Sequence, residues 1–292
     1  MQRRSFFKLL AAALAAGTFG WPAPSRAAGE IADDPLAVLD DALWIPDGPD
    51  NARHLYVIGA PWCAYCATVY RETRKVTGRV QLRWLETGAE EDDRSLRFVA
   101  EAALGRDPST LAALYAGKKG APKALDMPPL VIENARRCQR FAAKRVMNWL
   151  RAAGGRGPVA YPQLVYRRED RTVLSVGAPR SLEKLLAAIV PRPAAKTVQS
   201  RLGPLLDMHY TRRPVAAAPY FAKRDATRVY CLPDPRAIPI VELATGEGYN
   251  ALSITEVPGG GKWLELKLYP DDYGSGFAPL AAFETGDARG AT

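Results

Sequence analysis

Two cysteines separated by two residues are the side chains whose types and spacing can do chemistry. Cys63 and Cys66 follow a short apolar run, 55–58, and a break at Gly59. The run predicts a buried strand, and the apolar spacing after Cys66 predicts a helix that begins at Cys63. Unpaired N–H groups at a helix N-terminus favour a thiolate, the form that attacks a disulfide. The sequence therefore predicts a redox pair in which Cys63 attacks and Cys66 resolves.

Two other interpretations of this pair stay open. A C-x-x-C can be half of a zinc site, but zinc needs two more ligands. The other cysteines and histidines are not paired at ligand spacing; they are Cys138, Cys231, His54 and His209. The second alternative is an inert structural disulfide. The strand–turn–helix context favours redox chemistry, so we expect no metal and no bound cofactor, because the cysteines carry the two electrons.

A later stretch has the form needed to complete such a site. Pro162 opens an apolar strand that ends near Tyr166, and residues 172–176 form its partner strand after a turn. Gly177 then leads into a helix whose N-terminus is capped by Ser181. The predicted order is strand, turn, strand, glycine and helix.

These features resemble the thioredoxin superfamily, an α/β fold, over about 43–190, within a predicted thioredoxin-like domain that spans 28–190. In that fold a proline in cis packs against the C-x-x-C and opens an edge for substrate backbone. The resemblance therefore implies a cis bond between Tyr161 and Pro162.

Within the superfamily, the sequence resembles the bacterial DsbC/DsbG branch of disulfide isomerases. Trp44-Ile45 before a polar turn and Tyr65 before the second cysteine carry this likeness. Trp62 is more like thioredoxin itself, and Tyr161 before the proline is unusual. The resemblance implies that substrate binding and redox tuning fall to Trp62, Ala64, Tyr65, Tyr161 and Pro162.

The resemblance implies an exported thiol:disulfide oxidoreductase that acts on disulfide-containing envelope or secreted proteins. Branch likeness favours an isomerase or reductase kept reduced by a membrane thiol reductase of the DsbD type. A DsbA-like dithiol oxidase is the alternative, although Ala64-Tyr65 lacks the histidine typical of strong oxidants. A hypothesis from another class is a non-catalytic adaptor of an envelope or secretion apparatus, in which the C-terminal region is the working part.

Residues 1–27 read as a signal peptide. A twin-arginine-like segment at 3–8, an apolar run at 9–16 and a cleavage site at 25–27 follow one another. Export by the twin-arginine or the Sec route leads to the periplasm, where disulfide chemistry is permitted. An uncleaved anchor is the alternative.

Length and charge set further bounds. The 292 residues, 48% hydrophobic, suffice for two domains. The formal charge is +9, and the signal segment holds four basic residues and no acid, which leaves 9 − 4 = +5. No zinc finger, helix-turn-helix or aromatic–basic interleave indicates nucleic-acid binding.

The distance from Cys66 to Pro162, 96 residues (162 − 66), predicts an insertion into the thioredoxin-like domain. Val80, Leu82 and Trp84 alternate with polar residues and predict the second strand, and an acidic turn follows at 86–93. We expect a helical insertion at about 92–156 that forms one wall of the substrate groove. Its expected helices cover 95–104, 107–117 and 132–152.

The rest of the chain changes character. Residues 191–226 are expected to be a linker with a helix at 197–210, and 285–292 a tail. Residues 227–284 predict an all-β region with strands at 228–232, 238–243, 249–256, 263–269 and 277–283.

A glycine turn before 262–266 and the segment 276–278 resemble a small Src-homology-type barrel, which implies a peptide or cell-wall ligand. Trp263 is interpreted either as core or, with Tyr269 and Tyr273, as the lining of a groove. For Cys138, a buried thiol and a disulfide with Cys231 both stay open.

Overall fold

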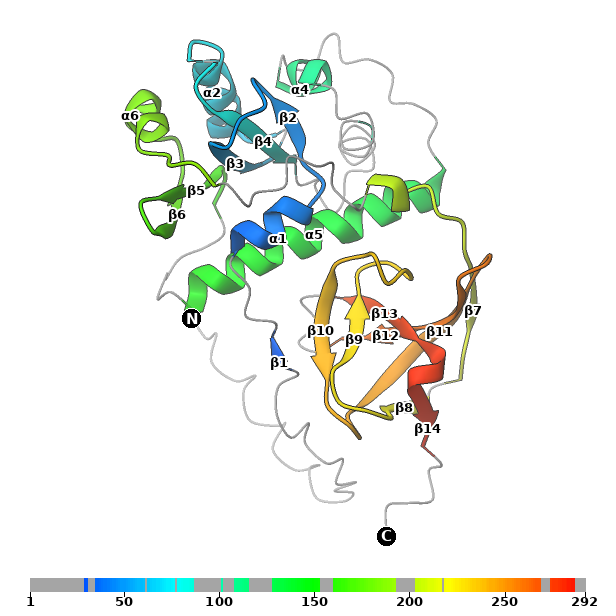
Figure 1. Ribbon diagram of the computed structural model, residues 1–292. Helices are drawn as coiled ribbons and strands as arrows, with labels where there is room; N and C mark the ends of the chain where they lie inside the picture. The colour runs from blue at the N-terminus through cyan, green and yellow to red at the C-terminus, as the bar shows by residue number, and fades with distance from the viewer. Residues whose placement is uncertain are drawn as a thin grey trace, which may run out of the picture.

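The described residues of the computed structural model form two β-sheets, with most helices gathered around the first, a five-stranded sheet (Figure 1). Among the described residues no helix is both long and apolar enough to cross a membrane. The predicted signal peptide, most of the helix expected at 95–104 and most of the tail lie outside the described residues. The structure describes residues 29–30, 35–60, 62–76, 78–86, 101, 108–115, 128–152, 160–192, 203–216, 218–268 and 274–286.

The first sheet has the order β2-β4-β3-β5-β6, in which β3 and β4 are parallel and the other neighbours antiparallel. Helix α2 (Ala64–Thr73) links β3 to β4, and α6 (Leu182–Ala187) follows β6. The thioredoxin-like order expected around the C-x-x-C and Pro162 is confirmed. The strands are β2 (Ile45–Asp47), β3 (His54–Gly59), β4 (Gln81–Glu86), β5 (Gln163–Arg168) and β6 (Arg171–Val176).

Both faces of this sheet are covered. One face packs with Cys66 and Val69 of α2 and with Leu186 of α6. The other packs with Leu39 of α1 (Pro35–Asp41) and with Val146 of α5 (Pro129–Ala152). As a result every residue of β3 and β4 is buried, including the polar residues of β4 that the sequence alternation pointed toward solvent.

One of the fully buried polar residues of β4 is Arg83. Its side chain is 0% exposed, its Nη1 lies 2.8 Å from Oδ1 of Asp40, and its guanidinium lies 4.1 Å from the ring centre of Trp44. Arg192 reaches the other oxygen of Asp40 at 3.0 Å. A buried charge must be paired, so this cluster joins α1, β4 and the segment after α6.

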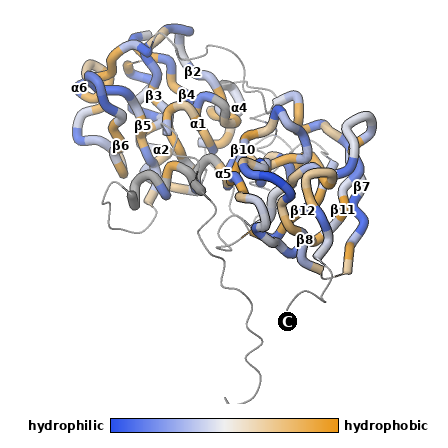
Figure 2. The backbone as a smooth tube through the Cα atoms, turned by 60° about the horizontal axis from the view of Figure 1, so that its bottom comes forward, coloured by the Kyte–Doolittle hydropathy of each residue, from blue (hydrophilic) through white to orange (hydrophobic). Residues whose placement is uncertain are grey.

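The described residues do not confirm a separate helical subdomain in the insertion expected at about 92–156. Leu111 of α4 (Pro108–Tyr115) belongs to the same core as Cys66. Helix α5 runs between the two sheets, which form separate lobes in Figure 2. Its residue Cys138 packs in the core of the second sheet, whereas Val146 packs against the first. Helix α5 therefore joins the two lobes, and its expected role as a wall of the substrate groove gains no support.

Of the nine described strands of the second sheet, eight follow the path β1-β10-β9-β13-β12-β11-β8-β14, and the ninth, β7, pairs with β11. The path is open at both ends, so the Src-homology-type barrel is not confirmed, although the all-β character of 227–284 is. The strands are β1 (Gly29–Glu30), β7 (Thr211–Pro214), β8 (Pro219–Ala222), β9 (Thr227–Tyr230), β10 (Pro239–Leu243), β11 (Gly248–Val257), β12 (Gly261–Lys267), β13 (Ser275–Pro279) and β14 (Phe283–Thr285).

Three of these strands lie where the sequence predicts something else. Strands β7 and β8 fall in the expected linker, and both pair with β11. Strand β1 starts the expected thioredoxin-like region but pairs with β10. Of the helix expected at 197–210, the described part contains only a 3-10 turn, Gly203–Leu205. Trp263 is 4% exposed and packs with Phe277, as a core residue does.

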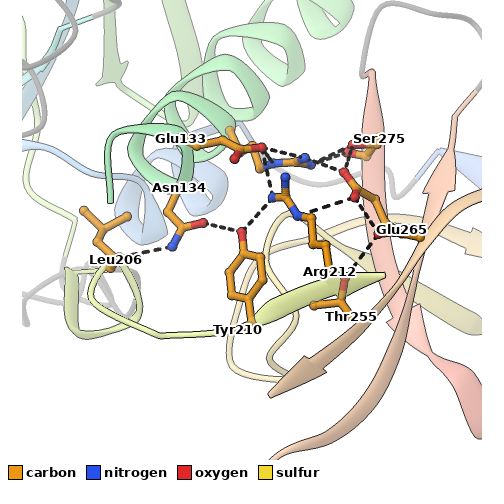
Figure 3. Close-up of polar contacts among 10 residues, drawn as sticks. Glu133, Asn134, Leu206, Tyr210, Arg212, Thr255, Glu265 and Ser275 are labelled. Atoms are coloured by element: carbon orange, nitrogen blue, oxygen red, sulfur yellow. Dashed lines mark hydrogen bonds and ion pairs between the residues drawn. The ribbon is translucent and has the colours of Figure 1, made fainter. Parts of the chain in front are cut away.

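A polar network joins α5 to the second sheet (Figure 3). Arg137 of α5 reaches Glu265 of β12 at 2.5 Å and the hydroxyl of Ser275 at 2.7 Å. Arg212 of β7 lies 2.9 Å from Glu133 of α5. These buried and half-buried ion pairs fix the register of the helix on the sheet.

Candidate functional site

The cysteine pair occupies the N-terminus of α2. Cys63 is the N-cap residue with extended backbone (φ −81°, ψ 116°), and its Sγ accepts a hydrogen bond from the N–H of Cys66 at 3.3 Å. This N–H is one of the groups that a helix start leaves without a backbone partner. The helix therefore places a donor and the positive end of its dipole on the sulfur of Cys63.

The two thiols have different surroundings. Cys63 is partly exposed, whereas Cys66 is 0% exposed and packs with Val69 and Leu164. Burial raises the pKa of Cys66, and the neighbouring Cys63 sulfur adds to the effect. A molecule in solution can therefore reach the sulfur of Cys63 but not that of Cys66.

The segment before β5 brings the expected proline to this helix. The bond between Tyr161 and Pro162 is cis, as expected, and Pro162 is buried. The carbonyl oxygen of Tyr161 lies 3.5 Å from Sγ of Cys63. The structure thus brings together Cys63, Cys66 and the Tyr161–Pro162 segment, which are nearly 100 residues apart in the chain.

Exposed apolar side chains lie next to Cys63 in the chain and next to the strand that follows the cis proline. Trp62 is 53% exposed and Tyr65 is 67% exposed, and Ala64 between the cysteines is also exposed. Val176, 50% exposed, pairs with Gln163 directly after the cis proline. Such a surface suits an extended or unfolded polypeptide better than a small polar molecule.

A buried carboxyl group, Glu86, lies near the thiol of Cys66, a position that the sequence alone does not predict. Instead of opening an acidic turn, Glu86 is the last residue of β4 and pairs in register with Gly59 of β3. It is 0% exposed, and its Oε2 has no hydrogen-bond partner among the described residues. Burial raises the pKa of Glu86 to about 7, against a smaller opposite effect of its hydrogen bond with Tyr115.

Aromatic side chains hold this carboxyl group. The hydroxyl of Tyr115 in α4 donates to Oε1 of Glu86 at 2.5 Å. The ring of Tyr115 stacks on Tyr70 of α2 at 4.9 Å and lies 5.6 Å from Trp84 of β4. One signal in the sequence could have found Glu86: it is an acid at the end of the strand expected to lie beside the C-x-x-C strand.

The other side chains considered as zinc ligands lie away from the cysteine pair. Cys138 and Cys231 face each other at 3.8 Å in the core of the second sheet. His54 lies 3.1 Å from the guanidinium of Arg83, and burial followed by that positive charge lowers its pKa to about 4. Within the described ranges, no three His, Cys, Asp or Glu side chains gather as a metal site requires.

No protein-family model and no curated protein sequence matches this chain. Among solved structures, it is similar to a disulfide interchange protein from Neisseria gonorrhoeae, with 17% identity, a TM-score of 0.33, and coverage of 53% of this chain and 99% of that one. It is also similar to Pseudomonas aeruginosa DsbA2, with 18% identity, a TM-score of 0.34, and coverage of 49% and 91%. Proteus mirabilis ScsC gives 17% identity, a TM-score of 0.28, and coverage of 48% and 75%. Because these identities and TM-scores are low, the similarity assigns no function to this chain.

Proposed function

We propose that this chain is a thiol–disulfide oxidoreductase whose redox pair is Cys63 and Cys66. The contrast between the two thiols carries the proposal: Cys63 is partly exposed and caps α2, and Cys66 is buried one turn further on. Attack by an accessible sulfur and resolution by a protected one is the order that thiol–disulfide exchange needs. The pair itself holds the two electrons, so the reaction needs no bound cofactor.

In the reducing direction, the thiolate of Cys63 attacks one sulfur of a substrate disulfide. The substrate S–S bond breaks, one substrate thiolate leaves, and a mixed disulfide joins Cys63 to the other sulfur. The thiolate of Cys66 then attacks Sγ of Cys63, which releases the second substrate thiolate. Two electrons pass to the substrate, and the pair ends as a disulfide. Oxidation of a dithiol substrate is the reverse sequence.

The resolving step needs a base, because burial raises the pKa of Cys66. The carboxylate of Glu86 is the buried charge beside it, and its pKa of about 7 matches that task near neutral pH. We assign to Glu86 the acceptance of the Cys66 proton during resolution and its return in the reverse reaction.

The substrate class follows from the surface around Cys63. Trp62, Ala64 and Tyr65 on one side and Tyr161 and Pro162 on the other would contact a polypeptide that carries the disulfide. The half-buried Tyr161 places its carbonyl oxygen beside the reacting sulfur. We therefore propose disulfide-containing proteins as substrates.

The direction of net transfer depends on the reduction potential of the pair relative to its partner. The likeness to the DsbC/DsbG branch favours an isomerase or reductase. In this proposal the predicted signal peptide directs the chain to the periplasm, and a DsbD-type membrane reductase keeps its cysteine pair reduced. A DsbA-like oxidase uses the same residues in the opposite direction. The competing hypothesis is a non-catalytic adaptor. In that hypothesis the C-terminal sheet binds a peptide or cell-wall ligand.

Trapping the mixed disulfide tests this proposal. The Cys66→Ala variant, incubated with a scrambled-disulfide protein, should accumulate a covalent complex that a thiol reductant dissolves. The matched control, Cys63→Ala, should form none. A complex formed equally by both variants, or by neither, contradicts the proposal and favours the adaptor.

A further inference from the structure

The two cysteines outside the C-x-x-C meet in the interior of the protein. Cys138 lies near the middle of α5, and Cys231 comes directly after β9. Their sulfurs are 3.8 Å apart although the residues are separated by 93 positions in the chain. Both side chains are buried, at 0% and 1% exposure. Because this dithiol has no part in the chemistry at Cys63, its position calls for a separate explanation.

The surrounding contacts hold both cysteines in place. The N–H of Cys231 donates to the carbonyl of Ile238 at 3.0 Å, which closes the turn after β9. One turn before Cys138, the amide of Asn134 donates to the carbonyl of Leu206 at 3.1 Å and accepts from the hydroxyl of Tyr210 at 2.7 Å. These contacts and the ion pairs in Figure 3 fix α5 against the second sheet. The close approach of the sulfurs is thus imposed by the packing of two elements.

The distance is compatible with a covalent bond. A disulfide has an S–S length of about 2.05 Å and accepts a range of Cα separations. Sulfurs already in van der Waals contact reach that length through small rotations of their side chains. We propose that Cys138 and Cys231 form a disulfide that fixes α5 to the C-terminal sheet whenever a disulfide oxidant is present.

The oxidant can approach from one side. A cavity of about 800 Å³ between α5 and the sheet is lined by Cys231, with Phe141 and Ile240 beside it, and Cys138 is not part of its lining. Burial raises the pKa of Cys138, and the neighbouring Cys231 adds to this. Cys231 is therefore the sulfur that reacts first.

A small disulfide such as glutathione disulfide can serve as the oxidant. The Cys231 thiolate attacks it, one glutathione thiolate leaves, and a mixed disulfide forms. Cys138 loses its proton and attacks Sγ of Cys231, which releases the second glutathione. The two cysteines lose two electrons and two protons, and the oxidant becomes two thiols.

Peptide mapping of the full chain tests this inference. After incubation with glutathione disulfide, free thiols are alkylated and the chain is digested with trypsin without reduction. The expected product joins the peptides 138–140 and 229–236, with a mass two hydrogens below their sum, and it disappears after reduction. The peptide 54–71, which holds both C-x-x-C cysteines, shows in the same digest whether the oxidant has acted.

A Cys63→Ser/Cys66→Ser variant separates this inference from the proposed function. It should give the same cross-linked peptide, and its free thiol count in denaturant should fall from two to zero. Three results would each overturn the inference. Cys138 and Cys231 could both still be alkylated after oxidation, or the reaction could end at a mixed disulfide with glutathione. In the chain without substitutions, Cys138 or Cys231 could instead be linked to a cysteine of the C-x-x-C.

Discussion

Glu86 and Cys66 both approach Gly59, the residue that ends β3. A Cβ placed on Gly59 would lie 3.3 Å from Oε1 of Glu86 and 3.6 Å from Sγ of Cys66, and only 2.9 Å from the hydroxyl of Tyr115. The absence of a side chain at Gly59 thus lets the carboxyl group approach the buried thiol. A carboxyl group therefore lies close to a thiol that is buried away from solvent.

We predict that Glu86→Gln slows the resolving step. Without the carboxylate, the buried Cys66 thiol loses its proton less readily, so the mixed disulfide at Cys63 should persist longer. A loss of about 10²-fold is typical for removal of a positioned base. Rapid quenching and gel analysis of the mixed disulfide would measure its lifetime. An unchanged lifetime at pH 8 contradicts the role given to Glu86.

The same variant should change the pH dependence of stability. Because burial raises the pKa of Glu86 to about 7, the folded state binds a proton that the unfolded state releases above its ordinary value near 4.5. Stability of the parent chain therefore falls as pH rises from about 4.5 through 7. Glu86→Gln should remove this fall, with a gain on the order of a few kcal/mol at pH 8 and little at pH 4. Urea denaturation at both pH values would measure it.

We predict that Trp62→Ala and Tyr65→Ala weaken binding of protein substrates. Both side chains are exposed beside Cys63, so their removal costs contact area with the polypeptide, about 1–2 kcal/mol for each. The expected readout is a raised KM for a disulfide-containing protein, with a smaller change in kcat. Leu252→Ala is the matched control, because Leu252 is 45% exposed on β11 of the other lobe. If all three substitutions changed KM equally, the proposal that Trp62 and Tyr65 contact the substrate would be contradicted.

We predict that Asp40→Asn destabilises the chain by about 3–5 kcal/mol. Asp40 pairs with both Arg83 and Arg192 in the interior. The change removes a buried counter-charge from both guanidinium groups. Glu72→Gln, which breaks an exposed pair with Lys75 at 2.7 Å, should cost less than about 1 kcal/mol. Chemical denaturation would measure the free energy of unfolding of both variants. Equal decreases in that free energy would contradict the larger contribution assigned to the buried cluster.

Acid should loosen the contact between α5 and the second sheet. Burial raises the pKa of Glu265, but the charges of Arg137 and Arg212 outweigh it and hold the pKa below its usual value of 4.5. This contribution to stability is present above pH 4.5 and is lost as pH falls through the lower folded pKa. Glu265→Gln should lower the Tm at neutral pH and flatten its dependence below pH 4.5. A parallel shift of the whole curve would contradict this account.

Much of the first lobe could be predicted because its signals are local. The apolar run before Cys63, the proline before β5 and the cap at Ser181 each identify one element without knowledge of the rest. The cis bond at Pro162 followed from the resemblance to a known fold. The strands of 227–284 could also be found, since turn residues separate them.

What could not be predicted depends on contacts between distant segments. Glu86 was assigned to a turn because an acid usually marks solvent, and its burial follows from the parallel pairing of β3 with β4. Strand β7 has four exposed residues and no apolar alternation, so only its pairing with β11 reveals it. An open sheet and a closed barrel have the same local pattern and differ in which edges meet.

The most direct test of the central claim is the redox equilibrium of Cys63 and Cys66. The full chain would be equilibrated in glutathione buffers, and the state of the peptide 54–71 read by mass spectrometry, which separates this pair from Cys138 and Cys231. We expect one reversible two-electron transition that Cys63→Ser abolishes. A potential between about −120 and −180 mV indicates a catalyst of disulfide formation or rearrangement, and one near −270 mV indicates a reductase. No reversible transition in this peptide would contradict the account.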